Sequence, residues 1–342
     1  MLNIGLVCGA DWRISKWKNR KIRQCVRFAR VHSVQIPVHC EHGYSGFASR
    51  CCCDTLRAVD ASVETLIQLA LTEDIGAGDV TSLYFVPEKK QSRAFVVARE
   101  EGVISGVDVA VCVLQKVDDS LSVTVLLGDG TRVSRGAVVM EISGNARSIL
   151  TAERTLLNFL QRLSGVASLT RKYVEAVAHT NARILDTRKT TPGWRWLEKR
   201  AVVHGGGTNH RMGLYDRAMV KDNHLMAEGR AEALQEAIRR LKTDHPGVEV
   251  ELEADNLAQV TEFLRWEGVD HILLDNMTLE DMKNAVALRG ERRKPLLEAS
   301  GGVNLDTVRA IAETGVDFIS VGALTHSAKS MDLAMDFAEE PA

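Results

Sequence analysis

The sequence lacks any apolar run approaching the roughly 20 residues that a membrane-spanning helix needs, so we predict no transmembrane helix and no membrane partner. It is also poor in cysteine after its first 53 residues. Six of its seven cysteines come before that point, and only Cys112 follows it. A region with one cysteine has no internal disulfide and is typical of a reducing compartment. We therefore predict a cytoplasmic protein.

Charge is unevenly distributed along the chain. Residues 1–60 hold ten Lys and Arg against four Asp and Glu, a net charge of +6, whereas residues 61–342 carry −8. Such a basic, acid-poor beginning is found in organelle-targeting peptides and in nucleic-acid-binding arms. Aromatic and basic residues hardly alternate in it, so we predict no nucleic-acid partner, and Trp12 and Trp17 do not support targeting. We interpret residues 1–60 as a basic, poorly ordered extension.

A zinc site in this extension is an alternative that the spacing disfavours. His39, Cys40, His42 and the run Cys51–Cys53 lie close together in the sequence. Structural zinc sites, however, use paired ligands at regular spacings, and these residues match no such pattern. We predict that they bind no metal.

The chain has the composition of an ordinary globular protein, with 45% apolar and 26% charged residues, and room for two domains. Apolar residues between Val63 and Leu71 recur at helical spacing, which predicts an amphipathic helix. Residues 93–142 contain short runs of valine and isoleucine separated by glycine turns, which predicts a β-rich region. Another helix is expected from about Thr151. We predict a first α/β domain, an α/β sandwich, over residues 61–166.

After about residue 180, short apolar strands alternate with amphipathic helices, for which Asn256, Thr278 and Asn304 are candidate caps. Strand–helix units that recur every roughly 20–25 residues predict a parallel sheet, and their number favours a barrel over an open sheet. We predict this α/β barrel over residues 167–330, and a C-terminal helix or tail over residues 331–342 that packs on the first domain. The predicted strands are Arg183–Asp186, Arg217–Lys221, Val248–Glu253, His271–Asp275, Leu296–Glu298 and Phe318–Val321.

Positive side chains follow the first strands of this barrel, at the end where catalytic groups of α/β barrels gather. They are Arg188, Lys189, His210, Arg211 and Lys221. Cations brought together in one partly buried site need anions opposite them, and a ligand with several negative charges would supply these. The alternative is that they pair with Asp186, Glu198 or Asp216 in a solvated rim.

Acidic residues and glycines follow the later strands. Glu253 and Asp275 come at strand ends where a small hard cation such as Mg²⁺ could sit with phosphate oxygens. Salt bridges to Lys221 or Lys189 explain the same two residues equally well. Ser300-Gly301-Gly302 and Gly322 lie where α/β barrels often bind phosphate on backbone N–H groups.

Several strings are more specific than these patterns. The chain resembles the quinolinate phosphoribosyltransferase family, the carboxylating nicotinate-nucleotide pyrophosphorylases, in order over about residues 61–335. The strings that carry the resemblance include EDIGAGDVTS from Glu73, AERTLLNFLQRLSG from Ala152, ILDTRKTTPG from Ile184, GGGTNHR from Gly205, VKDNH from Val220, LLDNM from Leu273, LEASGG from Leu297 and SVGALTHS from Ser320.

The resemblance implies a type II phosphoribosyltransferase fold, in which an α/β sandwich packs on an incomplete barrel of seven units. It implies transfer of phosphoribosyl from phosphoribosyl pyrophosphate to quinolinate with decarboxylation, which gives nicotinate mononucleotide in de novo NAD biosynthesis. It also implies Mg²⁺ as cofactor and a homodimer or larger oligomer, in which Arg154 reaches into the neighbouring subunit's site.

The resemblance further assigns roles to residues. Arg188, His210, Arg211 and Lys221 would hold the quinolinate carboxylates, and Lys189 would bridge towards phosphoribosyl pyrophosphate. Glu253 and Asp275 would contact the ribose hydroxyls and the metal. The 5′-phosphate would be bound by Ser300, Gly301, Gly322 and His326.

Three other functions are left open by the residues themselves. A related phosphoribosyltransferase that acts on nicotinate or another anionic ring would release no carbon dioxide. A biotinyl or lipoyl carrier is suggested by the spacing of glycine and valine in residues 128–144, but residues 121–150 contain no lysine for attachment. A pseudoenzyme that binds phosphoribosyl ligands without turnover is disfavoured by the intact set of acidic and basic residues.

Overall fold

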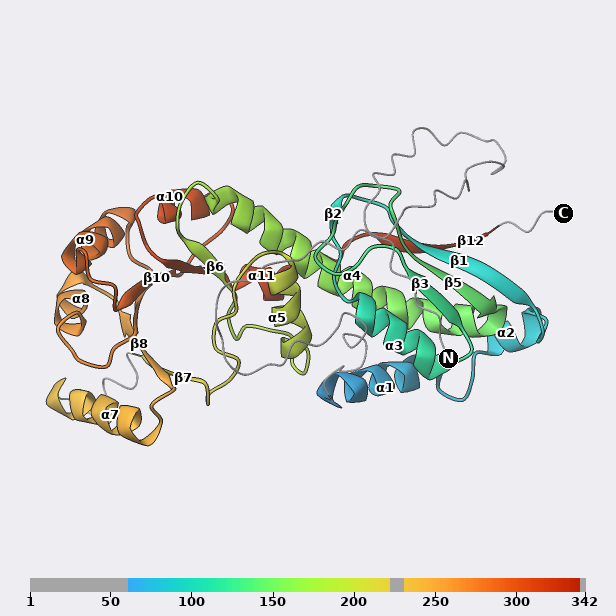
Figure 1. Cartoon of the computed structure of the whole chain (residues 1–342), viewed down its shortest axis with the longest axis horizontal. Coiled ribbons are helices and arrows are strands. Elements are labelled where there is room, and N and C mark those ends of the chain that lie inside the picture. The colour runs from blue at the N-terminus through green and yellow to red at the C-terminus, as the bar shows by residue number, and fades with distance from the viewer. Residues whose placement is uncertain (1–60, 222–230, 339–342) are drawn as a thin grey trace, which may run out of the picture.

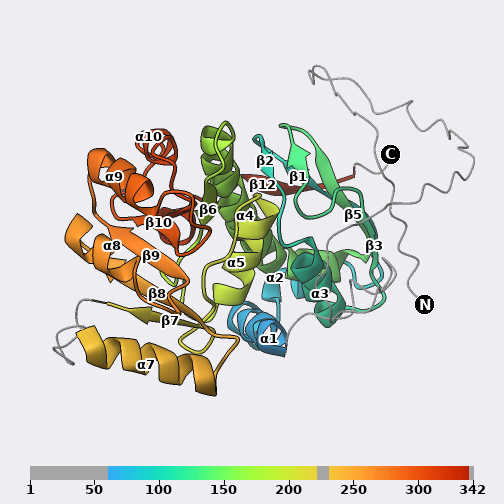
Figure 2. The ribbon, with the colours of Figure 1, turned by 60° about the vertical axis from the view of Figure 1, so that its left-hand side comes forward.

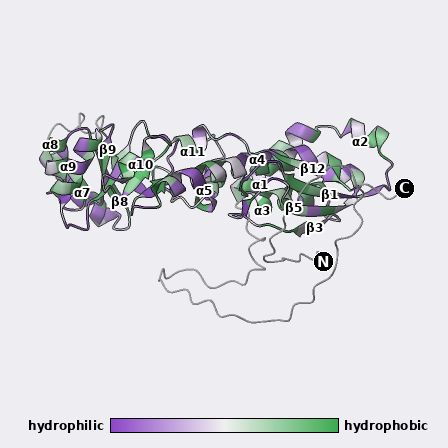
Figure 3. Ribbon diagram, turned by 90° about the horizontal axis from the view of Figure 1, so that it is seen from above, coloured by the Kyte–Doolittle hydropathy of each residue, from purple (hydrophilic) through white to green (hydrophobic). Residues whose placement is uncertain are grey.

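The computed structural model describes residues 61–221 and 231–338. The predicted extension, residues 1–60, and its candidate zinc ligands lie outside the described residues. The chain forms two parts that lie side by side, a sheet-and-helix part and a barrel part (Figure 1). From above, α5 (Arg195–His204) and α11 (Ala323–His326) lie between them (Figure 3).

The first part is built around an antiparallel four-stranded sheet in the order β12-β1-β5-β3. Its helix α1 buries Val63, Ile67 and Leu71 on one face, as the apolar spacing predicted. The elements before the long helix are α1 (Ala61–Ile75), α2 (Val80–Phe85), β1 (Gln91–Ala98), β2 (Gly102–Val103), α3 (Val107–Val117), β3 (Ser122–Val125), β4 (Arg132–Val133) and β5 (Val138–Asn145).

Helix α3 was not predicted, because its sequence is rich in valine and lies in a region that we interpreted as β-rich. Its residues Val109, Val113 and Leu114 are fully buried, and it packs against α1 and α4. β-Branched residues disfavour a helix only weakly, so burial on several sides outweighs propensity here.

The C-terminal segment is a strand, β12 (Leu333–Phe337), where we predicted a helix or a tail. It pairs antiparallel with β1, so that Ala94 faces Phe337 and Ala98 faces Leu333. Leu333 and Met335 are buried while Ala334 and Asp336 are only partly so, which is the two-residue period of a strand. After α11, the last barrel helix, the chain therefore returns to the edge of the first sheet.

The second part is a parallel sheet of six strands in the order β6-β11-β10-β9-β8-β7, and all six predicted strands are correct to within two residues at each end. An isolated parallel bridge between Leu185 and Thr208 adds a seventh segment beside β6. Strand pairing within the described residues does not join β7 to this segment, so the barrel is incomplete, as expected. The strands are β6 (Arg183–Leu185), β7 (Arg217–Val220), β8 (Glu249–Ala254), β9 (His271–Asp275), β10 (Leu296–Ser300) and β11 (Phe318–Ser320).

Helices cover the outside of this sheet (Figure 2). They include α7 (Ala231–Asp244), α8 (Leu257–Phe263), α9 (Leu279–Arg289) and α10 (Val308–Ala312). Two of the predicted caps are confirmed, because the side chains of Asn256 and Thr278 accept backbone N–H bonds at the starts of α8 and α9. Asn304 instead accepts from Thr307 in the turn before α10, whose first flanking residue is Thr307.

One helix, α4 (Ala146–Val177), belongs to both parts. Its 32 residues span about 48 Å at 1.5 Å per residue, and the boundary that we predicted after residue 166 falls inside it. It contacts β1 and β5 in the first part and β6 and α10 in the second. In the part of the chain that the structure describes, no helix is both long and apolar enough to cross a membrane.

Candidate active site

The predicted site residues of the barrel all lie at or just after the carboxyl ends of parallel strands. Arg188 and Lys189 follow β6, and Arg211 follows the segment paired to β6 at Thr208. The others lie at the ends of the remaining strands or just after them: Lys221, Glu253, Asp275, Ser300, Gly301, Gly322 and His326. The fold therefore gathers these residues, dispersed over more than 130 positions of the sequence, at one end of the barrel.

Arg188 and Arg211 lie close enough that the charge of one affects the other. Burial lowers the pKa of Arg211, and the positive charge of Arg188 lowers it further. The Nε atom of Arg188 is buried without a hydrogen-bond partner. Within residues 61–221 and 231–338, no carboxylate lies within ion-pair distance of Arg188, Lys189 or Arg211. Like charges held together in this way indicate an anionic ligand.

The acids that were the alternative partners of these cations are bonded elsewhere. Asp186 pairs with the buried Lys199, and Glu198 pairs with Arg162 at 2.6 Å. Asp216 accepts backbone N–H bonds, which outweigh the effect of burial and lower its pKa. The solvated rim of ion pairs that we considered is therefore absent for these three acids.

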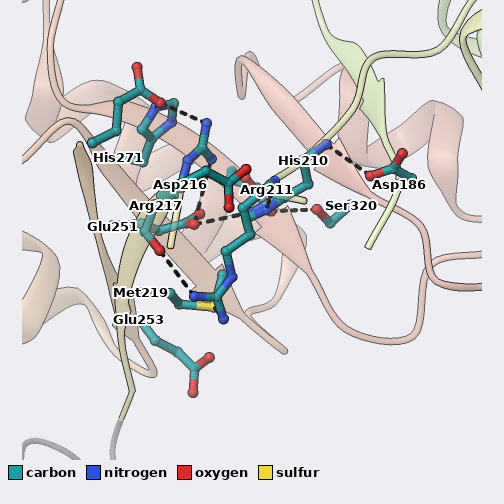
Figure 4. Close-up of polar contacts among 12 residues, drawn as sticks. Asp186, His210, Arg211, Asp216, Arg217, Met219, Glu251, Glu253, His271 and Ser320 are labelled. Atoms are coloured by element: carbon teal, nitrogen blue, oxygen red, sulfur yellow. Dashed lines mark hydrogen bonds and ion pairs between the residues drawn. The ribbon is translucent and has the colours of Figure 1, made fainter. Parts of the chain in front are cut away.

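His210 is buried under the site, with only 4% of its side chain exposed (Figure 4). Its Nδ1 accepts the backbone N–H of Arg211 at 2.6 Å. Its Nε2 lies 3.1 Å from Glu251 Oε2 and 3.5 Å from Glu298 Oε1. Both ring nitrogens thus face protein groups, and a direct contact of this ring with a substrate carboxylate would need a different orientation.

Glu251 and Glu298 form a buried carboxyl pair that we did not predict as part of the site. Burial and the negative charge of Glu251 raise the pKa of Glu298 well above its ordinary value. Burial alone would raise the pKa of Glu251 as well, but His210 and Arg217 outweigh it and lower that pKa to about 2. Ser320 donates a hydrogen bond to Glu298. The two carboxyl groups therefore lie side by side with their pKa values shifted in opposite directions.

These three side chains also form a group of potential metal ligands, with one atom from each within 4.8 Å of the others. The group consists of His210, Glu251 and Glu298 and is fully enclosed by the barrel. Within the cluster Glu251 faces both His210 and Arg217, and burial favours the protonated form of Glu298.

Glu253 and Asp275 have different surroundings. Glu253 is buried and pairs with Lys221, which is one of the salt bridges that we considered for it. Asp275 is partly exposed and accepts a hydrogen bond from the side chain of Asn276 at 2.7 Å, with no ion pair in the described part of the chain. The alternative that we considered for it, a salt bridge to Lys189, does not form among the described residues.

Two glycines are closely approached by neighbouring residues where the sequence predicted phosphate binding. A Cβ atom added at Gly301, whose φ is 98°, would lie 2.1 Å from the side-chain oxygen of Asn276. A Cβ atom added at Gly322 would lie 3.1 Å from both Lys189 Cδ and His326 Nε2. Lys189, Gly322 and His326 are thus neighbours although 137 positions separate the first from the last.

Arg154 lies apart from this group. It is exposed on the first half of α4, near Thr151 and Thr155, whose hydroxyls bond to Asp79 and Asp74. Among the described residues, no hydrogen bond or ion pair joins Arg154 to a barrel residue. The chain therefore does not bring Arg154 to its own barrel site.

Comparison with known proteins agrees with this arrangement. The family model for the quinolinate phosphoribosyl transferase N-terminal domain matches residues 79–164, and that for the C-terminal domain matches residues 166–336. The chain belongs to the quinolinate phosphoribosyl transferase family. The boundary between its two domains falls at Gly165 in the middle of α4, where an added Cβ would lie 2.0 Å from the carbonyl oxygen of Lys329.

Members of this family from distant organisms are similar over most of their length. A chloroplastic nicotinate-nucleotide pyrophosphorylase [carboxylating] of Arabidopsis thaliana is 42% identical, over 80% of this chain and 82% of its own. The Mycobacterium leprae protein of the same name is 43% identical, over 81% and 97%. The structure of the Francisella tularensis nicotinate-nucleotide pyrophosphorylase matches 83% of this chain and 99% of its own, with 39% identity and a TM-score of 0.76.

Proposed function

We propose that this protein transfers the phosphoribosyl group of phosphoribosyl pyrophosphate to quinolinate, and releases pyrophosphate and carbon dioxide as nicotinate mononucleotide forms. The observation that carries this proposal is the pair Arg188 and Arg211, which lie together at the barrel mouth with no carboxylate partner. Membership of the family and the names of its similar members support the substrate and the reaction.

Quinolinate carries two adjacent carboxylates, and the paired guanidinium groups suit them. Arginine binds carboxylates through two parallel N–H bonds, which fixes the orientation of the ring as well as its position. Lys221 would contact the same substrate with an N–H group that does not bond to Glu253. Lys189, beside Gly322 and His326, would face the phosphates of the second substrate.

Mg²⁺ is the cofactor that we propose, bound by Glu253 and Asp275. Two carboxylates at neighbouring strand ends fit this hard ion, which takes one or two protein carboxylates together with phosphate oxygens and water. The carboxylate oxygen of Asp275 that accepts no bond from Asn276, Oδ1, is available for such a role. When bound, the ion would neutralise the negative charge of the leaving pyrophosphate.

The residues of the chain would serve three steps. Arg188 and Arg211 orient quinolinate so that its ring nitrogen attacks C1 of the ribose as the C1–O bond to pyrophosphate breaks. Glu253 and Asp275 stabilise the positive charge that develops on the ribose, and Lys189 the negative charge on the departing oxygens. The pyridinium ring then accepts the electron pair of the breaking bond to the 2-carboxylate, which leaves as carbon dioxide, and a proton from solvent replaces it.

We also propose a homodimer or larger oligomer in which Arg154 enters the neighbouring subunit's site. The exposed side chain of Arg154, remote from its own barrel, supports this arrangement. The cytoplasm remains the compartment that we propose, although similar plant proteins are named chloroplastic or mitochondrial.

An assay with quinolinate labelled in its 2-carboxylate tests the reaction. With phosphoribosyl pyrophosphate and Mg²⁺, labelled carbon dioxide and nicotinate mononucleotide should form in equal amounts. Nicotinate offered in place of quinolinate is the control for the related enzyme without decarboxylation. More efficient transfer to nicotinate, with no carbon dioxide from quinolinate, would overturn the proposal.

A further inference from the structure

Helix α5 carries two buried charges at consecutive positions. Glu198 has 0% of its side chain exposed and Lys199 has 1%. Charged residues are almost never fully buried unless they are paired, because their desolvation is costly. Neither residue is among those predicted to contact a substrate, so their burial requires another explanation.

Glu198 holds the loop that follows β6. Its two oxygens accept the backbone N–H of Thr191 at 3.0 Å and the Thr191 hydroxyl at 2.9 Å. Arg162 of α4 bonds to the same carboxylate at 2.6 and 3.1 Å. The loop between β6 and α5 carries Arg188 and Lys189, so Glu198 anchors the stretch of chain just beyond both.

The same loop is also bonded to α11. Arg162 also donates to the carbonyl of Thr325 in α11, and the Thr325 hydroxyl donates to the carbonyl of Lys189 at 2.8 Å. Trp194, at the start of α5, stacks on Phe159 of α4 with ring centroids 4.8 Å apart. The loop is therefore fixed from α4, α5 and α11 together.

Lys199 holds the other cationic segment. Its Nζ bonds to Asp186 and donates to the carbonyl of His210 at 3.0 Å. Asp186 in turn accepts the backbone N–H of His210 at 2.9 Å. Both backbone groups of His210 are thus bonded to one buried ion pair, and Arg211 is the next residue.

We infer that Glu198 and Lys199 are positioning residues: Glu198 orients the loop that bears Arg188 and Lys189, and Lys199 with Asp186 orients the segment that bears His210 and Arg211. This inference rests on the proposed function, because it takes Arg188 and Arg211 as ligands of quinolinate and Lys189 as a ligand of the phosphoribosyl donor. Two neighbouring residues of one helix thereby set the spacing between the two cationic segments of the site.

The two positions have different expected effects on the two substrates. Loss of the Lys199 contact frees the backbone of His210, next to Arg211, so it weakens quinolinate binding. Loss of the Glu198 contact displaces Arg188 and Lys189, so it weakens the binding of both substrates. A displacement on the order of 1 Å in a positioning group costs up to about a hundredfold in rate, so KM changes of about tenfold are expected.

The opposite end of the barrel offers matched controls. Lys242 bonds to Asp270 at 2.5 Å and to the carbonyl of Val248 at 2.9 Å, the same pattern as Lys199. Asp317 pairs with Arg289 and accepts the backbone N–H of Leu297 at 2.8 Å, the same pattern as Glu198. Both pairs lie at the amino ends of strands, away from the proposed substrates.

The test is a steady-state analysis of KM for each substrate, on the full chain, with thermal unfolding measured in parallel. The double variant Lys199→Met, Asp186→Asn avoids leaving an unpaired buried carboxylate and should raise KM for quinolinate about tenfold, with KM for phosphoribosyl pyrophosphate within twofold of wild type. Glu198→Gln should raise both KM values. The controls Lys242→Met and Asp317→Asn should lower the unfolding temperature without changing either KM.

Folded variants at Lys199 and Glu198 with wild-type KM values, or with the same change as the controls, would overturn the inference. If the Lys199 double variant does not fold, Lys199→Met alone, assayed at low temperature, replaces it under the same criterion. The proposed function fails in a different way: the wild-type protein itself would then not consume quinolinate in the presence of phosphoribosyl pyrophosphate.

Discussion

The two parts of the molecule are stabilised by different kinds of interior. The core of the first part is apolar, and its buried polar side chains are serines and threonines such as Ser105 and Ser164. The barrel, in contrast, buries charged groups. Every buried Asp, Glu, Lys and His of the described residues lies in it: Asp186, Glu198, Lys199, His210, Glu251, Glu253, His271 and Glu298.

This difference separates stability from chemistry. α/β-Barrel interiors are usually filled with branched apolar side chains, and replacing a buried ion pair with apolar residues is often neutral or stabilising. A barrel that keeps many buried charges therefore does so for a reason other than stability. Departures from local rules are expected where a site must be held in a fixed geometry.

The largest expected effect on stability lies in the first part. Ile142 is fully buried in the central strand β5, where it faces Ala94 of β1 and Val123 of β3. Ile142→Ala should cost about 2–5 kcal/mol of the free energy of unfolding, from lost burial and the remaining cavity. Urea unfolding measures this cost. The KM values of the folded fraction should not change, and a large change in KM would contradict the separation of the two parts.

The reverse pattern is expected at the barrel mouth. Arg188→Ala should lower kcat/KM by on the order of 10²–10³, or about 2–4 kcal/mol of transition-state binding, as for a lost oxyanion donor. Because Arg188 has no carboxylate partner in the described part of the chain, the unfolding temperature should stay near that of wild type. The same is expected of Lys189→Ala. Near wild-type turnover in the double variant Arg188→Ala, Lys189→Ala would show that the site lies elsewhere.

Much of this organisation could be predicted from the sequence. Alternation of apolar strands and amphipathic helices was enough to predict the barrel, and the position of Arg188 or Glu253 directly after a strand placed each at one end of it. These predictions succeed because the carboxyl ends of parallel strands meet, whatever the details of packing.

The failures have a common physical cause, which is that burial is decided by distant contacts. The strand β12 pairs with β1 across more than 230 positions, and its apolar residues alone do not distinguish it from a short helix. Likewise the sequence did not predict that Glu251 and Glu298 would come from two other strands to meet the ring of His210. Local periodicity contains no information about such contacts between residues far apart in the sequence.

The buried carboxyl pair allows a sharper comparison within the barrel. Glu251 is the ionised member and faces His210 and Arg217, so Glu251→Gln should cost about 3 kcal/mol of the free energy of unfolding, as when a buried ion pair loses one partner. Burial and the negative charge of Glu251 raise the pKa of Glu298 and so favour its neutral form, which resembles an amide in charge. Glu298→Gln should therefore cost less than Glu251→Gln. Denaturant unfolding at pH 7 decides between them, and an equal or larger loss for Glu298→Gln would mean that both carboxyls are ionised.

The smallest effect is expected at the amino end of the barrel, where an ion pair serves stability alone. Burial by itself would raise the pKa of Asp270, but bonds from Lys242, Lys294 and the Val250 N–H outweigh it and lower that pKa to about 2. Since the ordinary value is 3.8, the folded state binds this proton less readily than the unfolded state. The resulting stability, about 2 kcal/mol by linkage, is present above pH 4 and is lost as the pH falls towards 2. Asp270→Asn should therefore destabilise the protein at pH 7 and reduce the dependence of its stability on pH in that acid range, while turnover at neutral pH stays unchanged. A loss of turnover without a loss of stability would place Asp270 in the chemistry of the barrel mouth, against the division between the two ends.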